Sequence, residues 1–321
     1  MEKLFVQIPA YNEQEIINKV IKEIPRKIPG ISEVKVLVID DGSTDKTVEV
    51  AKKAGADYIM RSTKNNGLAY AFQRGMNKAL ELGADIIVNT DADFQYNQKE
   101  IPKLVQPILE KKADIVSGNR QIGNLTHMAP AKKYGNIIGS KIVKLCAGYN
   151  IIDASSGFRA YSKEAALKLF VISNHTYTHE TLIQAKYKNL KVIEVPVEFR
   201  KRDGRSKLIK SVYGHIKKSM ATITRNTLMY NSMKVLGYLG AILIIIGLYP
   251  MVRWIYLSYI VMASGNHIQS LLLGTLLIVF GGLSILLGFI SDLIAINRRH
   301  LEEILYRVRK HDYETNGNRG V

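Results

Sequence analysis

The acidic triplet Asp91-Ala92-Asp93 is the clearest chemical feature of the sequence. Two carboxylates two residues apart can hold a divalent cation, and their hard oxygen atoms suit Mg²⁺ or Mn²⁺. A nucleoside diphosphate that departs during a reaction needs such a cation to neutralise its growing charge. A solvated turn would also explain the triplet, but here it follows a buried-looking apolar run at residues 86–89. We therefore predict a metal site at Asp91 and Asp93.

A second acidic run, Asp40 to Asp45, follows another apolar stretch. Gly42 suits a turn, and Ser43 or Thr44 is predicted to cap a helix that begins near Lys46. A helix cap does not explain two adjacent acids at the edge of a sheet. Carboxylates there can accept hydrogen bonds from a nucleobase imide or a ribose hydroxyl.

The elements that position these motifs alternate along the first half of the chain. The predicted strands are residues 4–8, 34–39, 58–60, 86–89 and 115–117. Apolar residues at helical spacing occupy residues 15–23, 46–53, 69–81 and 100–111. This alternation predicts a mostly parallel α/β sheet, whose ligands bind beyond the carboxyl ends of the strands. Farther on, the sequence predicts a loop, a helix and a strand at residues 121–130, 132–147 and 191–197.

The net charge of +17 is concentrated in one stretch. Residues 199–234 contain ten Lys or Arg and a single acid, Asp203. Such a stretch favours a polyanionic partner, and an anionic membrane surface is preferred to nucleic acid because apolar segments follow it. A solvated basic face is the alternative. Residues 210–230 mix basic and apolar residues at helical spacing, which predicts an amphipathic helix in the membrane interface.

Two uncharged apolar spans follow, residues 235–252 and 268–290, of 18 and 23 residues. The shorter one would be about 27 Å long as a helix, which matches a bilayer better than the alternative of a buried soluble helix pair. Basic residues flank the pair on both outer sides, so both ends are expected in the cytoplasm. The predicted parts are a cytoplasmic domain at 1–209, an interfacial region at 210–234, two transmembrane helices within 235–297 (about 235–258 and 268–292), and a basic cytoplasmic tail at 298–321.

The compartment follows from two further observations. The single cysteine, Cys146, excludes an intramolecular disulfide and fits a reducing environment. The N-terminal residues enter a strand-like run at once, so no signal peptide is expected. We therefore expect a multi-pass protein of the cell membrane, with its main domain and both termini in the cytoplasm.

The ordered set of motifs between residues 3 and 210 resembles family 2 glycosyltransferases. More narrowly, it resembles the branch of dolichol-phosphate mannose synthases and polyprenyl-phosphate glycosyltransferases. The motifs are Ile8 to Glu13, Asp40 to Asp45, Asp91 to Gln95, Ser117 to Arg120, Asp153 to Arg159 and Gly204 to Lys207. The resemblance implies a GT-A type (Rossmann-like) sheet domain. It also implies metal-dependent, inverting transfer of a sugar from a GDP- or UDP-linked nucleotide-sugar to a polyprenyl or dolichyl phosphate.

The same resemblance implies individual roles. On the donor side it implies that Pro9, Tyr11 and Glu13 line a nucleoside pocket and that Asp41 contacts the base. It implies that Asp91 contacts the ribose and diphosphate. Asp93 and Gln95, together with Asp91, would form an Mg²⁺ or Mn²⁺ site. On the acceptor side it implies that Arg120 contacts the sugar or the acceptor phosphate, and that Ser156, Gly157 and Arg159 shape the acceptor site. The residues implied to bind phosphate near the membrane are Arg202, Arg205, Ser206 and Lys207. One departure affects the local loop: Phe94-Gln95-Tyr96-Asn97 stands where the family often has Leu-Gln-His-Pro.

The acceptor determines the expected mechanism. A lipid phosphate is already anionic at neutral pH, so it can attack the anomeric carbon without a general base and needs positioning and charge screening instead. Screening is expected from basic residues that include Arg120, Lys132 or Lys133, Arg202 and Lys207. Glu180 is a candidate base or sugar ligand, with an acid on a helix surface as the alternative.

Three other functions were weighed. A processive polysaccharide synthase would share the donor motifs, but its Gln-x-x-Arg-Trp pattern is broken because Pro250 stands where the glutamine belongs before Arg253-Trp254. An inactive scaffold is disfavoured by the intact acidic triplet, and nucleic-acid binding would leave the two apolar spans unexplained. A nucleotide-sugar, a lipid phosphate and membrane lipids are the expected partners, while the identity of the sugar and any homo-oligomer remain open.

Overall fold

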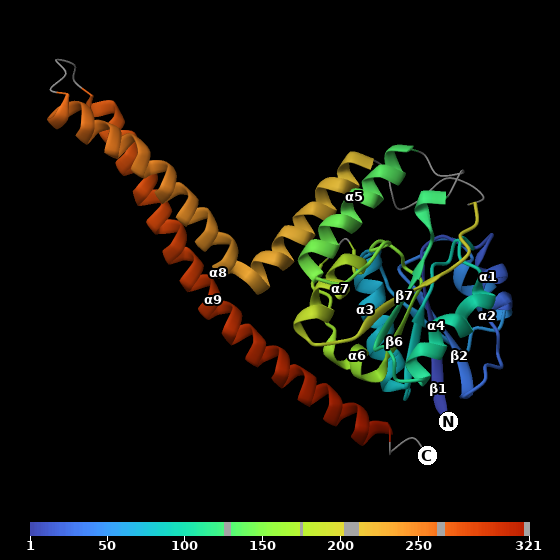
Figure 1. The fold of residues 1–321 in the computed structure, drawn as a ribbon. Helices are drawn as coiled ribbons and strands as arrows, with labels where there is room; N and C mark the ends of the chain where they lie inside the picture. The colour runs from blue at the N-terminus through green and yellow to red at the C-terminus, as the bar shows by residue number, and fades with distance from the viewer. Residues whose placement is uncertain (125–129, 174–175, 202–211, 262–266, 318–321) are drawn as a thin grey trace. The chain divides into compact units, whose positions relative to one another are not determined.

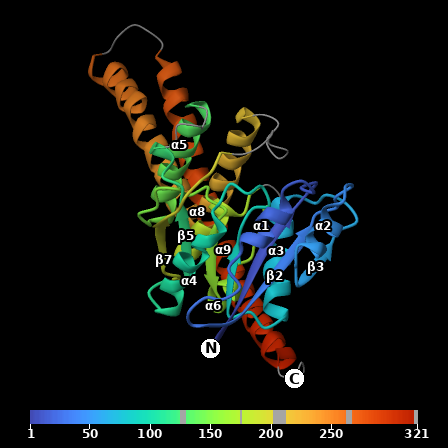
Figure 2. The ribbon, with the colours of Figure 1, turned by 90° about the vertical axis from the view of Figure 1, so that its right-hand side faces the viewer.

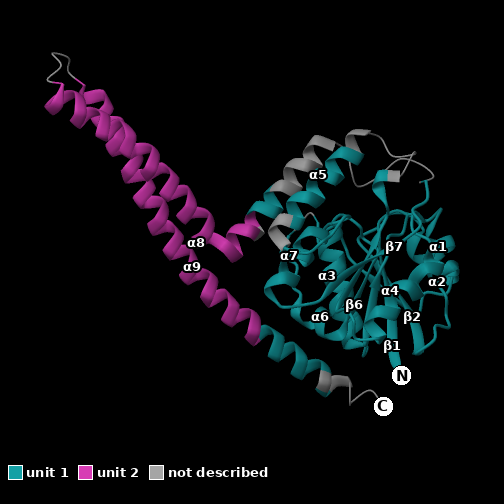
Figure 3. Ribbon diagram, in the orientation of Figure 1, with its two compact units in different colours: residues 1–224, 305–321 teal, residues 225–304 magenta. Residues whose placement is uncertain are grey.

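The computed structural model describes residues 1–124, 130–173, 176–201, 212–261 and 267–317 (Figure 1). The chain divides into two compact units (Figure 3). Unit 1 comprises residues 1–224 and 305–321, and unit 2 comprises residues 225–304. The domain boundaries expected from the sequence stay predictions.

Unit 1 is built on a seven-stranded sheet with the order β3-β2-β1-β4-β6-β5-β7. Its strands are β1 (Glu2–Ala10), β2 (Ile31–Asp40), β3 (Tyr58–Arg61), β4 (Ile86–Asn89), β5 (Ile115–Asn119), β6 (Arg159–Ser162) and β7 (Val192–Pro196). All neighbouring strands run parallel except β6, which is antiparallel to both β4 and β5. The predicted mostly parallel α/β sheet is therefore confirmed, and β6 is an addition that the sequence analysis missed.

Helices cover both faces of this sheet, which is why its central strands are apolar on both sides (Figures 1 and 2). The helices of unit 1 before residue 212 are α1 (Ile17–Glu23), α2 (Thr47–Lys53), α3 (Leu68–Glu81), α4 (Ile101–Leu109), α5 (Pro130–Ala147), α6 (Lys163–Lys168) and α7 (Thr178–Tyr187). In β1, Leu4 and Val6 pack in the core cluster that contains residues of α1 and α4. Phe5 packs in the opposite cluster, with residues of α3 and α6.

The strands β1, β2 and β4 end at one edge of the sheet. The amide of Asp41 donates to the carbonyl of Ala10 at 2.9 Å, and the amide of Thr90 donates to the carbonyl of Gln7 at 3.1 Å. These bonds continue the strand pairing into the loops. The three polar motifs that follow these strands therefore start side by side, as the parallel topology predicts.

Unit 2 consists of the main parts of two long helices, α8 (Val212–Ile255) and α9 (Ile268–Gly317). α8 is interrupted by a non-helical residue, Asn231, near the end of the amphipathic helix expected over residues 210–230. A five-residue π-helix, Tyr256–Ile260, follows α8.

Glycine pairs bring α8 and α9 into close contact within unit 2. A Cβ atom on Gly240 would lie 2.5 Å from the carbonyl oxygen of Gly281, and one on Gly247 would lie 2.9 Å from that of Gly274. Each pair thus permits a backbone approach that a larger residue would block. Small residues at such crossings are typical of helix packing in membranes.

Within the part of the chain that the structure describes, two helices are long and apolar enough to cross a membrane, Thr227–Ile260 and Ile268–Tyr313, with mean hydropathies of 2.2 and 2.4 in their most apolar windows. Only 17% of either window is buried in the structure, so these segments do not resemble the core helices of a soluble protein. Large apolar side chains are exposed along both, including Ile245, Tyr249, Leu272 and Leu286. The structure therefore confirms the expected order of parts, a mostly parallel sheet domain followed by two helices of membrane length.

The last part of α9 belongs to unit 1 and packs on α6. The hydroxyl of Tyr306 donates to the Glu164 carboxylate at 3.0 Å. The buried Arg309 donates to the carbonyls of Leu167 and Leu169 at 3.1 and 3.0 Å. The chain therefore leaves unit 1 before the first candidate span and contacts it again at the end of α9.

Candidate active site

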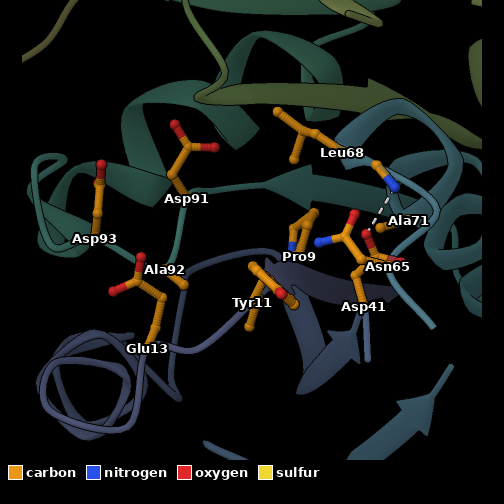
Figure 4. Close-up of a pocket in the computed structure, with 12 residues that line it drawn as sticks. Pro9, Tyr11, Glu13, Asp41, Asn65, Leu68, Ala71, Asp91, Ala92 and Asp93 are labelled. Carbon is orange, nitrogen blue, oxygen red and sulfur yellow. Dashed lines mark hydrogen bonds between the residues drawn. The ribbon is translucent and has the colours of Figure 1, made fainter. Parts of the chain in front are cut away.

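A pocket opens where β1, β2 and β4 end (Figure 4). Its lining comes from the loops after these strands and from the start of α3. The lining residues are Pro9, Ala10, Tyr11, Glu13, Asp41, Asn65, Gly67, Leu68, Ala71, Asp91, Ala92 and Asp93. Six residues assigned to the donor side by the sequence analysis are therefore brought together: Pro9, Tyr11, Glu13, Asp41, Asp91 and Asp93.

The loops after β1 and β2 are held together by side-chain hydrogen bonds. Asn12, which has a left-handed backbone with φ 55°, donates its amide to the Ser43 hydroxyl at 2.9 Å. The amide of Glu13 donates to the Thr47 hydroxyl at 2.8 Å. The predicted cap at Ser43 or Thr44 is wrong, because α2 begins at Thr47 with no side-chain cap and the Ser43 hydroxyl serves Asn12 instead. The turn predicted at Gly42 is confirmed by its φ of 78°.

Asp41 is fixed at the wall of the pocket. Its carboxylate accepts hydrogen bonds from the amides of Asn66 and Gly67 at 3.0 and 2.8 Å. Burial raises the pKa of Asp41 above its ordinary value, and the two amide donors oppose that rise. The neighbouring Asp40 is buried and lies 3.5 Å from Arg61 Nε. Recognition of the base by Asp41 stays a prediction.

The stretch before α3 was missed as part of the site. Asn65, Gly67 and Leu68 line the pocket, and Gly67 has a φ of 97° that favours glycine. The Asn66-Gly67 dipeptide ahead of a helical pattern is a turn signal that marks this loop in the sequence. What the sequence does not show is that this loop folds back onto Asp41.

Asp91 and Asp93 follow β4 and face the pocket together with Ala92 (Figure 4). The amide of Gln95 donates to Asp93 Oδ1 at 3.2 Å, and its side chain donates to the carbonyl of Arg200 at 3.4 Å. Phe94, between Asp93 and Gln95, has a φ of 59°, so the backbone takes a left-handed conformation directly after the acidic triplet. Among the described residues, no group of three His, Cys, Asp or Glu side chains could hold a metal by itself.

Gly157 lies against Asp91. A Cβ atom at position 157 would be 3.0 and 3.1 Å from the two carboxylate oxygens of Asp91 and 2.9 Å from the Tyr177 hydroxyl. Only a glycine allows this approach without displacing the carboxylate. Gly157, in the segment of residues 153–159, therefore packs beside the acidic triplet.

Arg120 lies in a buried ion pair. Its Nε and one terminal nitrogen donate to the two oxygens of Asp153 at 2.6 and 2.7 Å, and it also donates to the Ser155 hydroxyl at 2.7 Å. The Asp153 carboxylate raises the pKa of Arg120 despite burial, and Arg120 in turn lowers the pKa of Asp153. The guanidinium also lies 5.2 Å from the ring centroid of Phe199. A direct contact of Arg120 with the reacting groups stays a prediction.

Two other predicted residues, Ser156 and Arg159, are absent from the lining of the pocket. Ser156 is buried, with its hydroxyl 3.4 Å from that of Tyr96. Arg159 is fully buried in β6, where it donates to the carbonyls of Ala154 and Thr178, both at 2.7 Å. Their burial and their hydrogen bonds favour a structural contribution to the acceptor side.

Glu180 is fully buried in α7, so the alternative of an acid on a helix surface is wrong. Its carboxylate oxygens accept hydrogen bonds from the amides of Ile172 and Ser173 at 3.0 and 2.9 Å. These bonds hold the segment before α7. Glu180 is absent from the pocket lining, and a role as base or sugar ligand stays a prediction.

The basic residues expected near the acceptor phosphate are only partly described. Lys133 donates to the carbonyl of Gly123 at 2.5 Å. Outside the described residues lie Arg202, Arg205, Ser206 and Lys207, and the side chain of Lys132 lies outside them too.

Residues 5–170 match the model of the family described as Glycosyl transferase family 2. The chain belongs to this family. It is 34% identical over 218 residues to UDP-N-acetylglucosamine–dolichyl-phosphate N-acetylglucosaminyltransferase of Methanococcus voltae, covering 61% of this chain and 84% of the relative. It is 28% identical over 229 residues to undecaprenyl-phosphate mannosyltransferase of Micrococcus luteus, covering 68% and 91%. The predicted resemblance to family 2 and to its polyprenyl-phosphate branch is confirmed.

The fold of this family 2 chain also matches solved structures. Glucosyl-3-phosphoglycerate synthase from Mycobacterium tuberculosis, in complex with Mn²⁺, UDP and glucosyl-3-phosphoglycerate, superposes with a TM-score of 0.55. The match covers 70% of this chain and 80% of the synthase at 22% identity. At that identity the likeness shows a shared fold, the GT-A type sheet domain.

The close approach of Gly157 predicts a large effect in this family 2 enzyme. Changing Gly157→Ala forces the Asp91 carboxylate to move, because the new methyl group would lie 3.0 Å from it. We expect glycosyl transfer to fall about tenfold, a loss typical of disturbing a group that orients a metal-binding side chain. Gly139→Ala in α5 is the control, since a Cβ there meets nothing within 4 Å. Equal initial rates for the two purified variants would contradict the prediction.

Proposed function

We propose that this protein transfers a sugar from a nucleotide-sugar, GDP- or UDP-linked, to a polyprenyl or dolichyl phosphate at the cytoplasmic face of the cell membrane. The observation that carries the proposal is a family 2 domain with an acidic pocket, followed by two helices of membrane length. The named relatives of Methanococcus voltae and Micrococcus luteus support a polyprenyl-type phosphate as the acceptor.

The donor half of the proposal rests on the lining of the pocket. Pro9, Tyr11 and Glu13 would surround the nucleoside, and Asp41 would contact the base or ribose. Asp91 and Asp93, which lie across the view from Asp41 in Figure 4, would face the diphosphate. Asp41 and the two acids after β4 thus stand apart in the lining, which supports contacts to two different parts of a nucleotide-sugar.

The residues present fit an Mg²⁺ or Mn²⁺ ion. Mg²⁺ is usually held by one or two carboxylates together with substrate phosphates, rather than by a full protein cage. Asp91 and Asp93 supply two carboxylates on one short turn, with Gln95 beside them, and the diphosphate would complete the set. The Mycobacterium tuberculosis synthase is itself described with Mn²⁺ and with Mg²⁺. When bound, the cation would neutralise charge that develops on the departing diphosphate.

The mechanism that we propose is an inverting, in-line attack by the lipid phosphate on the anomeric carbon. The phosphate oxygen forms the new bond to carbon as the bond from carbon to the nucleoside diphosphate breaks. Since the phosphate is already ionised, the protein need not remove a proton from it. Its contribution is to position the two anions and screen their repulsion. The contacts of Glu180 with backbone amides agree with a mechanism that uses no such base.

The proposed topology places both ends of the membrane hairpin in the cytoplasm. Basic residues precede the first candidate span and follow the apolar part of the second, among them Lys217, Lys218, Arg225, Arg298 and Arg299. The positive-inside tendency supports a cytoplasmic position for both sets. The contacts of Tyr306 and Arg309 within unit 1 add support, because they tie the chain after the apolar stretch to the domain that precedes it.

A transfer assay tests the proposal. Purified full-length protein in detergent is mixed with Mg²⁺ or Mn²⁺, polyprenyl phosphate and each of a panel of radiolabelled nucleotide-sugars. We expect one donor to label a lipid fraction that mild acid releases, because a sugar linked through a phosphate to a lipid is acid-labile. A growing water-soluble polymer would instead favour a processive synthase. Donor binding without any transfer would indicate another acceptor or an inactive protein.

A further inference from the structure

A row of polar side chains crosses the buried sheet directly below the pocket. Strand register pairs each member with the next, and paired residues point to the same face of a sheet. The row, from β1 through β4, β6 and β5 to β7, consists of Gln7, Asn89, Arg159, Ser117 and Glu194. We name it the polar row.

This row interrupts an apolar face. On the same face of the sheet, two residues before Gln7, Asn89 and Ser117 in their strands, lie Phe5, Ile87 and Ile115. All three are buried in the core against α3 and α6. Gln7 and Asn89 are nevertheless 0% exposed. Burying such groups destabilises a fold unless hydrogen bonds compensate, so the contacts of the row should explain its presence.

Three members of the row hold one backbone segment, residues 152–157. Glu194 accepts hydrogen bonds from the amides of Ile152 and Asp153, both at 2.8 Å. Arg159 donates to the carbonyl of Ala154 at 2.7 Å. Asn89 donates to the carbonyl of Gly157 at 2.8 Å.

Asn89 is itself fixed from two sides. Its side-chain oxygen accepts a hydrogen bond from Gln7 at 2.9 Å, and its nitrogen also donates to the Tyr177 hydroxyl at 2.7 Å. Tyr177 stacks on Phe72 of α3, with ring centroids 3.9 Å apart. The Tyr177 hydroxyl in turn donates to the carbonyl of Gly157 at 3.3 Å. Asn89 and Tyr177 thus meet at one carbonyl.

That carbonyl belongs to the residue that touches Asp91. A Cβ atom added at Gly157 would lie 3.0 Å from the Asp91 carboxylate, so the backbone of Gly157 lies close beside Asp91 and a shift of this backbone would alter the room left for the carboxylate. The other end of the held segment carries Asp153, the partner of Arg120. One segment therefore connects the polar row to both charged groups beside the pocket.

We propose that the polar row is a positioning device for the active site, in which Asn89 and Tyr177 set the place of Gly157 and thereby the orientation of Asp91 toward a bound cation and diphosphate. The inference rests on the proposed donor site, but not on the identity of the acceptor. Neither residue lines the pocket, so both act through Gly157. Partners of this kind typically change metal affinity or activity by about 10- to 100-fold when altered.

The test compares Tyr177→Phe with Tyr149→Phe in the full-length protein. Tyr177→Phe keeps the ring stacked on Phe72 and removes only the hydroxyl between Asn89 and Gly157. Tyr149→Phe is a matched control, because its hydroxyl also donates to a backbone carbonyl, that of Leu190, at 2.6 Å. Leu190 precedes β7, at the opposite end from the edge that bears the pocket.

The first readout is Mn²⁺ binding in the presence of UDP or GDP, followed by the paramagnetic resonance signal of unbound Mn²⁺. We expect Tyr177→Phe to weaken Mn²⁺ binding about tenfold and Tyr149→Phe to leave it unchanged. The second readout is transfer, where kcat should fall about tenfold for Tyr177→Phe without a change in the KM for lipid phosphate. A melting temperature close to wild type shows that each variant is folded.

A second variant guards against an effect of the tyrosine alone. Asn89→Leu keeps nearly the size of the side chain and removes the donor to Gly157 without burying a new carboxyl group. We expect the same loss of Mn²⁺ affinity. Equal Mn²⁺ affinities for wild type, Tyr177→Phe and Asn89→Leu would overturn the inference.

The binding readout separates the two proposals, because it needs neither acceptor nor transfer. Weaker Mn²⁺ binding by both variants, with no sugar transfer by wild type, would support the positioning role and contradict the proposed reaction. Normal sugar transfer by wild type, with Mn²⁺ affinities of both variants equal to that of wild type, would support the proposed reaction and contradict the positioning role. If wild type with UDP or GDP binds no Mn²⁺, the positioning role is overturned, whereas the proposed reaction is judged by the transfer assay alone.

Discussion

Changing Asp93→Asn is expected to lower sugar transfer at least about a hundredfold. The substitution keeps the size of the side chain and an oxygen that can accept the Gln95 amide, and it removes one negative charge from the acidic triplet. Loss of several kcal/mol of electrostatic stabilisation in a transition state corresponds to this magnitude. The measurement is kcat at saturating nucleotide-sugar and Mn²⁺, with the fold checked by the melting temperature.

The control is an aspartate of similar structural importance away from the pocket. Asp114 accepts a hydrogen bond from the amide of Lys191 at 2.8 Å, so Asp114→Asn also replaces a carboxylate that holds a backbone group. We expect this variant to retain nearly full activity. A kcat for Asp93→Asn within a factor of about three of that for Asp114→Asn would remove Asp93 from the proposed metal site.

Changing Asp153→Ala is expected to produce the largest loss of stability. It leaves the Arg120 guanidinium, which is only 8% exposed, without the carboxylate that binds it through two nitrogens. Removing one partner of a buried ion pair typically lowers the free energy of unfolding by about 3–5 kcal/mol. The free energy of unfolding is measured by chemical denaturation of the full-length protein in detergent, with a spectroscopic signal of unit 1 as the readout.

Two further variants distinguish the loss of the Arg120–Asp153 ion pair from the general effect of a substitution on stability. Arg120→Met together with Asp153→Ala removes both charges, and we expect it to be more stable than Asp153→Ala alone, because no unpaired buried charge remains. Glu33→Ala breaks an exposed pair with Lys35, of 2.6 Å, and should change stability by less than about 1 kcal/mol. A double variant less stable than Asp153→Ala would show that Arg120 is stabilised by other contacts.

Much of the sheet was predictable because its strands obey local rules. Residues 4–8, 34–39 and 86–89 are apolar runs buried on both faces, which is the pattern of central parallel strands, and all three are strands in the structure. The parallel topology then placed the motifs after them at one edge. The lining of a single pocket by Tyr11, Asp41 and Asp91 follows from that rule and not from any one motif.

β6 was missed because its sequence does not look like a buried strand. It begins with Arg159, a charged residue that local patterns assign to the surface, yet Arg159 is fully buried. Its guanidinium is compensated by carbonyls of Ala154 and Thr178, which lie in separate parts of the chain. Burial of this kind depends on tertiary partners that a local pattern cannot reveal.

The same limit applies to charged groups near the pocket. Arg120 was expected to face an anionic ligand, whereas its described partner is Asp153, 33 residues later in the chain. Ser43 was expected to cap a helix, whereas its hydroxyl binds Asn12 from another loop, 31 residues away. In each case the residue type was informative about the need for a polar partner. Only the fold decided which partner it met.

The most direct test of the proposed reaction is to compare polyprenyl phosphate with unphosphorylated polyprenol as acceptors for wild type and Asp93→Asn, using the same labelled nucleotide-sugar. We predict label in an acid-labile lipid only with wild-type protein and polyprenyl phosphate, because the phosphate is the attacking group and Asp93 lies in the pocket that we assign to the diphosphate. Equal labelling of polyprenol, or undiminished labelling by Asp93→Asn, would contradict the proposal.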